Sequence, residues 1–368
     1  RQGKHNSKRG RLVANQTIKT PRFYTDLVSY FRARGSAIGA ISSTTGTIQV
    51  QTGSVHELFD LRPLNQVTFD TSANPANHVL TKITFSTAQF KQNYIAILNH
   101  NLKTAVGKIR IFAGDVSSDI IALDGGNADT ADINWGSVAT VDVVNGDIRT
   151  AASDNKSLVI EPASDGTTII TFPEQGLRYW AIQFEGNTTN TGNAINGTWG
   201  STDFAVGGIM IGEYFDMPVS PDLSLTRSIV YDKVNVSESA GGQRYSTATS
   251  FGKTASSTSK SPFALGTYPQ NAYGGRQVYN LNFSYLNNTD LLPAENSIYG
   301  FSDDSVISDV WNMIDGPSRP FIFSIDNSSA GSNAESEHLF ARFAQDSLDM
   351  QQVAPNVYSV AMRIEEEF

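Results

Sequence analysis

Three consecutive runs decide the fold of this chain: RYWAIQFEG at 178–186, AVGGIMIGEYF at 205–215 and DMPVSPDLSLTR at 216–227. In the first run Trp180, Ile182 and Phe184 fall on one face of an extended chain, as apolar residues do in a two-layered sheet. The second run is rich in aromatic and β-branched residues, which favour strands. Prolines interrupt the third run because each lacks a backbone N–H. The stretch therefore predicts the closing strands of a β-sandwich, followed by a domain boundary.

The chain upstream of this stretch repeats the strand pattern. Polar turns separate the candidate strands, and this spacing indicates an antiparallel sandwich rather than alternating βαβ units. We therefore expect a mainly β protein with a sandwich over 46–215. The candidate strands are Thr47–Gln51, Asn65–Asp70, Val79–Ser86, Tyr94–Leu98, Lys108–Ala113, Val138–Val144, Ser157–Glu161, Thr167–Phe172, Arg178–Glu185 and Val206–Phe215.

Composition limits the kinds of protein this chain can be. Its 368 residues suffice for two or three domains, and 39% apolar residues suffice to build their cores. The absence of cysteine excludes disulfides, thiolate catalysis and cysteine-ligated metals. No window approaches the roughly 18–20 apolar residues of a membrane-spanning helix, so no membrane span is expected.

The N-terminal region is basic although the chain is acidic. Residues 1–34 hold nine Lys or Arg and one acidic residue, whereas the whole chain carries a net charge of −9. We expect a basic arm within 1–45 that docks on the acidic face of another copy or another protein. Nucleic acid is an unlikelier partner, because no aromatic residue precedes Phe23 to stack on bases. A solvated tail is the remaining alternative.

Two helices are predicted at opposite ends of the chain. Thr20 and Pro21 suit the start of the first, Phe23, Leu27 and Phe31 fall four residues apart, and a glycine at 35 ends it. The second is predicted over 302–316, with Val306, Ile307, Val310, Trp311 and Ile314 as its apolar face. This second helix belongs to a barrel-like domain expected over 216–368. Within that domain the polar segment 237–275 is nearly free of strand signal and is expected to be extended.

The sandwich region resembles a known fold family. YIAILNHNL at 94–102, KIRIF at 108–112, and the Tyr-Trp and GGIMIGEYF strands are similar to the discoidin-like, galactose-binding-like jelly roll over residues 56–215. The resemblance implies a fold that often binds carbohydrate through variable loops, so no ligand residue carries over. His100, between two asparagines, is interpreted as a turn residue that satisfies backbone groups.

The order of regions carries a second resemblance. YNLNFSYL at 279–286, RPFIFSID at 319–326 and the run from His338 to Phe368, together with the basic arm and the sandwich, resemble tail structural proteins of tailed bacteriophages, of the distal-tail or baseplate type. That resemblance implies a virion protein, assembled in the bacterial cytoplasm, whose barrel forms a ring and whose sandwich faces outward. Its partners would be copies of itself and other virion tail proteins.

The sequence offers little chemistry for catalysis. Its five histidines show no metal-ligand spacing, and no phosphate-binding loop, dinucleotide fingerprint or nucleophile elbow is present. We therefore expect no enzyme, no cofactor and no metal. The main alternative to a structural protein is a carbohydrate-binding adhesin, in which Trp135, Trp199 or Tyr179 stack on a host-surface glycan. A polysaccharide-degrading enzyme ranks below both.

Overall fold

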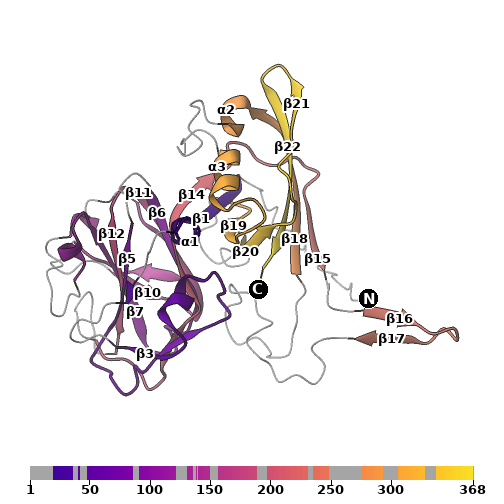
Figure 1. Cartoon of the computed structure of the whole chain (residues 1–368). Helices are drawn as coiled ribbons and strands as arrows, with labels where there is room; N and C mark the ends of the chain where they lie inside the picture. Colours follow the sequence, from indigo (N-terminus) through magenta and orange to yellow (C-terminus); the bar gives the residue numbers. More distant parts are fainter. Residues whose placement is uncertain are drawn as a thin grey trace, which may run out of the picture.

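The computed structural model describes residues 20–35, 40–41, 48–85, 91–121, 131–135, 138, 140–149, 156–188, 197–230, 235–247, 276–292, 306–327 and 337–367. These residues form antiparallel strands arranged in four sheets, together with three short α-helices. The mainly β fold class predicted from the sequence is confirmed. Figure 1 shows a sandwich joined to a second set of strands that curves around helix α3.

The sandwich consists of two facing sheets with a small third sheet beside them. One layer belongs to the largest sheet, and its strands in spatial order are β8 (Asp142–Val144), β11 (Gly166–Gln175), β6 (Gln92–His100), β14 (Gly208–Asp216) and β1 (Arg22–Asp26). The other layer contains β2 (Ala40–Ile41), β5 (Val79–Thr84), β12 (Tyr179–Gly186), β7 (Gly107–Gly114), β10 (Leu158–Pro162) and β9 (Gly146–Ile148). The third sheet contains β13 (Phe204–Val206), β4 (Val67–Phe69) and β3 (Val50–Thr52).

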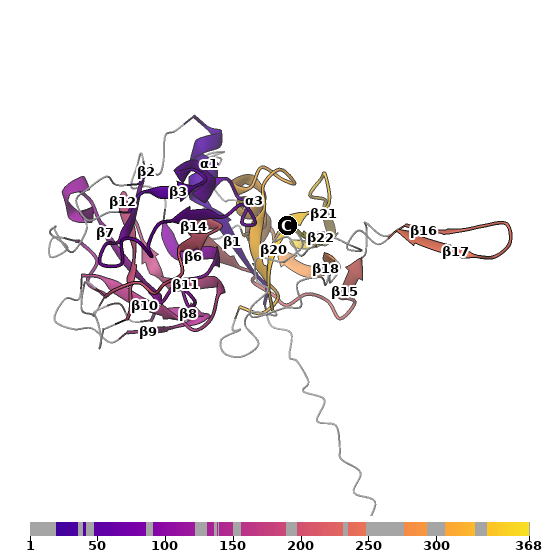
Figure 2. The same ribbon diagram turned by 90° about the horizontal axis from the view of Figure 1, so that it is seen from below.

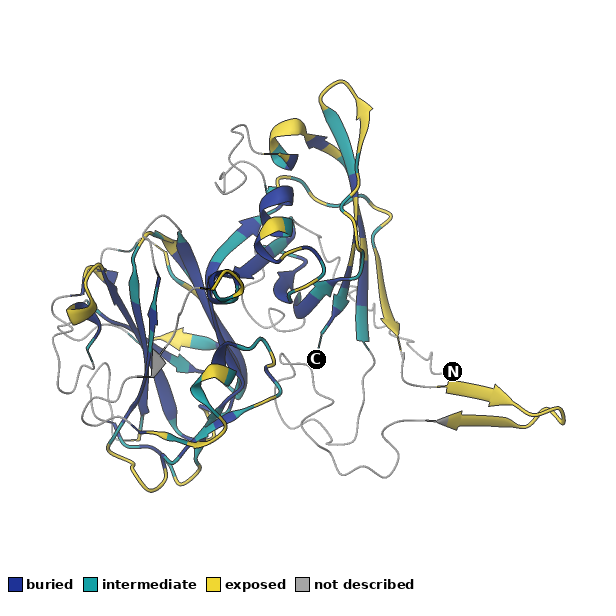
Figure 3. Cartoon of the chain, viewed as in Figure 1, coloured by how far each residue is buried: buried dark blue, intermediate teal, exposed yellow. Residues whose placement is uncertain are grey.

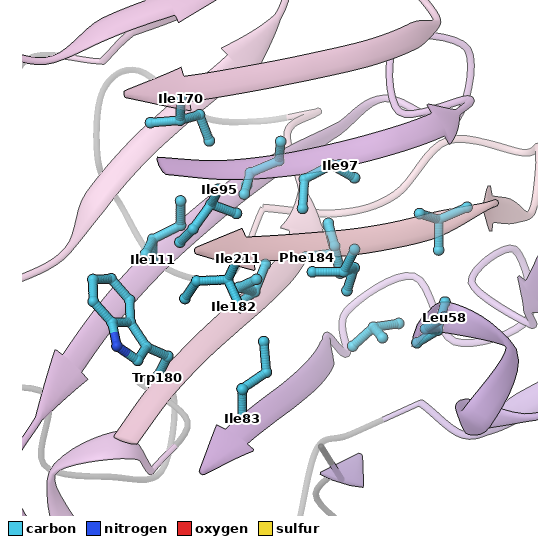
Figure 4. Close-up of a cluster of buried hydrophobic side chains, with 14 of the residues drawn as sticks. Leu58, Ile83, Ile95, Ile97, Ile111, Ile170, Trp180, Ile182, Phe184 and Ile211 are labelled. Atoms are coloured by element: carbon cyan, nitrogen blue, oxygen red, sulfur yellow. The ribbon is translucent and has the colours of Figure 1, made fainter. Parts of the chain in front are cut away.

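Apolar side chains from both layers fill the sandwich (Figure 4). Trp180 and Ile182 of β12 are fully buried and face Ile95 and Ile211 of the opposite layer, as their alternation predicts. Each candidate strand of the sandwich is present, with its ends moved by a few residues. The last candidate divides into β13 and β14 at Gly207, where an added Cβ would lie 1.8 Å from the carbonyl oxygen of Pro63.

Beyond β1 the largest sheet continues into the C-terminal part of the chain. Its further strands are β19 (Phe321–Ser324), β20 (His338–Phe343), β22 (Val357–Glu366), β18 (Arg276–Asn287) and β15 (Thr226–Val230), with β21 (Met350–Ala354) paired to β22. Helices α2 (Asn288–Leu291) and α3 (Val306–Met313) lie beside these strands (Figure 1). The expected barrel-like domain therefore takes the form of a curved run of strands that joins β1.

Helix α3 occupies the position predicted for the second helix. Ile307 and Val310 are buried in the C-terminal core, together with Ile314 just after the helix, as the apolar pattern indicates. The predicted helix start at 302–304 lies outside the described residues.

The prediction for the first helix is wrong at its start. Residues Arg22–Asp26 form strand β1, and helix α1 (Leu27–Ala33) begins only after Asp26, whose carboxylate accepts a hydrogen bond from the N–H of Ser29 at 2.8 Å. These residues form a strand rather than a helix because β1 pairs with β14 along one edge and with β19 along the other. Tertiary pairing thereby overrides the four-residue spacing of the aromatic residues. The predicted end at Gly35, which has φ +82°, is confirmed.

Strand β1 and helix α1 connect three of the hydrophobic clusters of the molecule. Phe23 packs in the C-terminal core, Tyr24 packs on the outer face of the sandwich layer, and Leu27 and Val28 pack inside the sandwich. The boundary expected after residue 215 falls at the end of β14, yet the sheet itself runs on through β1 into β19. The two halves of the chain thus share one continuous sheet.

The polar segment 237–275 contains strand structure that the sequence pattern did not predict. Strands β16 (Asn235–Glu238) and β17 (Arg244–Thr247) form a hairpin, and Gly242 has φ +78° in its turn. Figures 1 and 2 show this hairpin extending away from the rest of the molecule. Residues 248–275, and residues 1–19 of the basic arm, lie outside the described part of the chain.

Candidate assembly surface

Exposed apolar side chains concentrate on the C-terminal part of the molecule. Within the described residues, the large exposed apolar side chains of this part are Leu223, Ile229, Val230, Val236, Tyr245, Tyr285, Leu292 and Val353, whereas the sandwich exposes Val116 and Ile148. Strand β15 contributes Ile229 and Val230, and all of its residues are exposed. Because β15 pairs only with β18 among the described strands, its outer edge offers free backbone N–H and C=O groups.

The hairpin β16–β17 is the most isolated part of this surface. Residues 235–246 are all exposed, and Val236 and Tyr245 have 63% and 55% of their surface accessible (Figure 3). The contacts inside the hairpin are polar, such as the ion pair between Arg244 Nε and Glu238 Oε2 at 3.3 Å. A lone two-stranded hairpin is only marginally stable in water, because it buries little apolar surface. Val236 and Tyr245 are therefore available to a partner.

The aromatic residues predicted to stack on a glycan occupy different environments. Trp199 is 4% exposed, its ring stacks on Phe204 with centroids 5.4 Å apart, and its Nε1 donates to the carbonyl of Asn77 at 2.8 Å. Trp135 is 7% exposed and packs edge-on against Phe172. Stacking on a sugar needs an exposed ring face, and in this conformation neither indole offers one.

Tyr179 is half-buried on β12, and the guanidinium of Arg178 lies 5.4 Å from its ring centroid. The structure does not bring the three aromatic residues to one surface, because Trp135 and Trp199 belong to the sandwich core and Tyr179 packs on a separate cluster outside it. Glycan binding by the sandwich stays a prediction.

A buried charged cluster lies on the face of β7 and β12 that points away from the sandwich core. Arg110 Nε and Nη2 donate to Glu185 Oε1 at 3.0 and 2.7 Å, and Lys108 Nζ lies 3.3 Å from the same oxygen. Gln183 Nε2 donates to the other carboxylate oxygen at 2.9 Å, and Arg110 Nη1 donates to Ser157 at 2.9 Å.

The cluster is an internal ion network, because the cations of Lys108 and Arg110 both pair with the carboxylate of Glu185. Burial lowers the pKa of Lys108, and the adjacent carboxylate of Glu185 opposes this shift. Sequence reasoning missed the network, although its signal is present: Lys108 and Arg110 alternate with isoleucines, just as Gln183 and Glu185 alternate with Ile182 and Phe184.

His100 satisfies a neighbouring backbone group, as predicted, but it is the last residue of strand β6 rather than a turn residue. Its Nδ1 accepts from the backbone N–H of Leu102 at 3.3 Å, so its Nε2 carries the proton and donates to Thr168 Oγ1 at 2.9 Å. Thr168 in turn donates to the carbonyl of Asn145 at 3.2 Å. Burial lowers the pKa of His100 to about 4, opposed in part by Asp165. The ring is therefore neutral at pH 7 and serves as a structural link.

This burial predicts a pH dependence of stability. The unfolded chain binds a proton at His100 near pH 6.5, whereas the folded chain does so only near pH 4, so stability falls as the pH drops through this window. We expect His100 to remove about 3 kcal/mol of the free energy of unfolding between pH 7 and pH 4. Urea unfolding of the wild type and of His100→Gln at both pH values checks this. The variant has no imidazole at this position, so its free energy of unfolding should lack the decrease that protonation of His100 causes.

His56→Gln serves as the control for the replacement of histidine by glutamine, because His56 is exposed. Equal losses in the wild type and in His100→Gln would contradict the prediction.

The described residues contain no group of three or more His, Cys, Asp or Glu side chains placed to hold a metal ion. In the same part of the chain, no helix has the length and apolar character that crossing a membrane requires. Comparison of the chain with protein-family models, curated proteins and solved structures finds no match.

Proposed function

We propose that this chain is a non-enzymatic structural subunit of a bacteriophage virion, of the tail or baseplate type, and that it acts as a homo-oligomer. The exposed hairpin β16–β17 carries the assembly part of this proposal, because it presents Val236 and Tyr245 to solvent on a segment that buries nothing of its own. The virion setting rests on the resemblance of the arm, the sandwich and the C-terminal runs to phage tail proteins.

The hairpin and strand β15 are suited to contacts between copies. An extended arm on one subunit and an open strand edge on another are different surfaces, and such heterologous contacts close into rings when the rotation between copies allows it. Backbone pairing along a sheet edge supplies affinity, while side chains such as Ile229 and Val230 supply specificity. We infer that the hairpin of one subunit packs on a neighbouring copy.

The test is the oligomeric state of the whole chain. We expect native mass spectrometry and negative-stain imaging to show closed oligomers as concentration rises. The double variant Val236→Glu, Tyr245→Glu should weaken association at least about tenfold, since buried aromatic anchors dominate interfaces. The thermal midpoint of the dilute monomer should stay unchanged, because both side chains are exposed.

Val116→Glu is the matched control, because Val116 is 57% exposed on the sandwich and lies outside the proposed interface. It should assemble like the wild type. A wild-type chain that remains monomeric at high concentration would refute the proposal, and so would a double variant that assembles normally.

A further inference from the structure

A cavity of about 450 Å³ lies where the sandwich meets the C-terminal strands. Helix α1 and the loop after Phe59 form one side of it, and residues around β19, β20 and the end of β22 form the other. Its charged lining consists of Arg32, Arg62, Arg319, Arg342, Asp60 and Glu367. Four guanidinium groups thus face two carboxylates, in a chain whose net charge is −9. The cavity is a basic site in an acidic protein.

Two of the arginines are held in place by the protein. Arg32 Nη1 donates to the carbonyl of Phe59 at 3.0 Å, which anchors α1 to the sandwich loop. Arg342 Nη1 donates to the carbonyl of Pro317 at 3.0 Å, and its Nε lies 3.4 Å from Glu367 Oε2. These two residues therefore shape the walls of the cavity and contribute fixed positive charge.

Arg319 differs because part of its donor capacity is unused. Its Nη2 pairs with Asp315, yet Nε and Nη1 are buried and have no acceptor within hydrogen-bond distance among the described residues. The side chain is 11% exposed. Burial lowers the pKa of Arg319, and the carboxylate of Asp315 opposes that shift. A buried donor without an acceptor destabilises a fold unless a ligand or water supplies the acceptor.

We propose that this cavity binds a small oxyanion, the phosphate or carboxylate group of a ligand, with Arg319 as the central donor. Guanidinium groups form strong charge-assisted hydrogen bonds with such oxygens. Arg62, whose backbone N–H is held by Asp60 Oδ1 at 2.7 Å, adds a second cation from the opposite wall. Asp60 and Glu367 are the carboxylates of the lining and disfavour an anion placed next to them.

The position of the cavity means that a bound anion would lie between the sandwich and the C-terminal part of the chain. Arg62 belongs to the loop after Phe59, and Arg319 lies two residues before β19 of the C-terminal part. An anion between them links the two halves of the chain at a further place, in addition to the contacts made by strand β1. This inference does not depend on the proposed assembly, since the cavity lies apart in sequence from the hairpin and β15.

Binding is tested on the whole chain with sodium phosphate and sodium citrate against sodium chloride at equal ionic strength. We expect saturable binding by isothermal titration calorimetry, and a thermal midpoint that rises with anion concentration as mass action requires. General salting-out also stabilises proteins, but it does not saturate and acts on every variant alike. Saturation by phosphate alone identifies a phosphate group as the ligand, whereas saturation by citrate alone identifies a polycarboxylate.

The decisive comparison is Arg319→Gln with Arg363→Gln. Arg319→Gln should weaken binding at least tenfold, while Arg363→Gln, which removes an exposed arginine outside the cavity, should bind like the wild type. If Arg319→Gln fails to fold, Arg62→Gln replaces it, because Arg62 is exposed on a loop and the same loss of affinity is expected. Absence of saturable binding by either anion would overturn the proposal, as would unchanged binding in the folded cavity variant.

Discussion

Replacing Glu185 with glutamine is expected to lower the free energy of unfolding by about 3–5 kcal/mol, because it leaves two buried cations without their carboxylate. Arg110 and Lys108 both direct nitrogen atoms at Glu185 Oε1, and both side chains are almost completely buried. The glutamine keeps the shape of the side chain, so the decrease in the free energy of unfolding comes from the missing charge and not from altered packing. Urea unfolding at neutral pH measures it.

The pH dependence of this variant provides a second readout. Without the carboxylate, burial and the charges of Arg110 and Arg149 all lower the pKa of Lys108, which is already lowered in the folded chain. The folded state then releases its proton at a lower pH than the unfolded state, so stability rises with pH until the unfolded lysine also deprotonates near pH 10.5. The difference in the free energy of unfolding between Glu185→Gln and the wild type should therefore become smaller from pH 7 to pH 10.

An exposed ion pair supplies the control for this experiment. Glu174 lies 2.7 Å from Lys91, and both side chains are substantially exposed. Glu174→Gln should change stability by less than about 1 kcal/mol. If Glu185→Gln were equally mild, the charged cluster would be solvated in the native state and its structural role would be refuted.

Phe23→Ala is expected to destabilise the C-terminal core by about 3–5 kcal/mol, although the residue stands near the other end of the chain. Phe23 is 1% exposed, and its ring centroid lies 5.7 Å from that of Phe321, 5.4 Å from that of Phe323 and 6.1 Å from that of Phe343. Truncation leaves a cavity among three rings from β19 and β20. Hydrogen exchange should show the largest loss of protection in these two strands.

Tyr285→Ala is the matched control, because it removes an aromatic ring that is 76% exposed on β18. Its effect on stability should stay within about 0.5 kcal/mol when measured on dilute monomer. Loss of protection confined to β1 in Phe23→Ala, with β19 and β20 unaffected, would show that the strand does not support the C-terminal core.

The sequence predicted elements whose signal is local. The alternation at Trp180, Ile182 and Phe184 shows which side of β12 is apolar, and the spacing of Ile307 and Val310 gives α3, since both patterns arise from the geometry of a single element. The hairpin β16–β17 also had a local signal that was missed. Its turn contains Gly241 and Gly242 between two short polar strands, and glycine pairs favour hairpin turns.

The start of the first helix depended on information that is not local. A central strand buried on both faces lacks polar alternation, so Phe23, Tyr24 and Leu27 fit a helical stripe equally well. Only pairing with β14 and β19, far away along the chain, decides between the two. The cavity arginines escaped prediction for the same reason, because Arg62 and Arg319 approach each other only in the folded chain.

The central place of β1 in the sheet also determines when its two edges can pair during translation. Its partner β14 follows about 190 residues later, but its other partner β19 is synthesised about 105 residues after β14, which at about 5–20 residues per second means roughly 5–20 s of translation. Throughout that interval a nascent sandwich carries β1 as an open, apolar edge with Phe23 uncovered. Such an edge recruits other chains, so chaperone binding during translation should be concentrated between the emergence of β14 and that of β19.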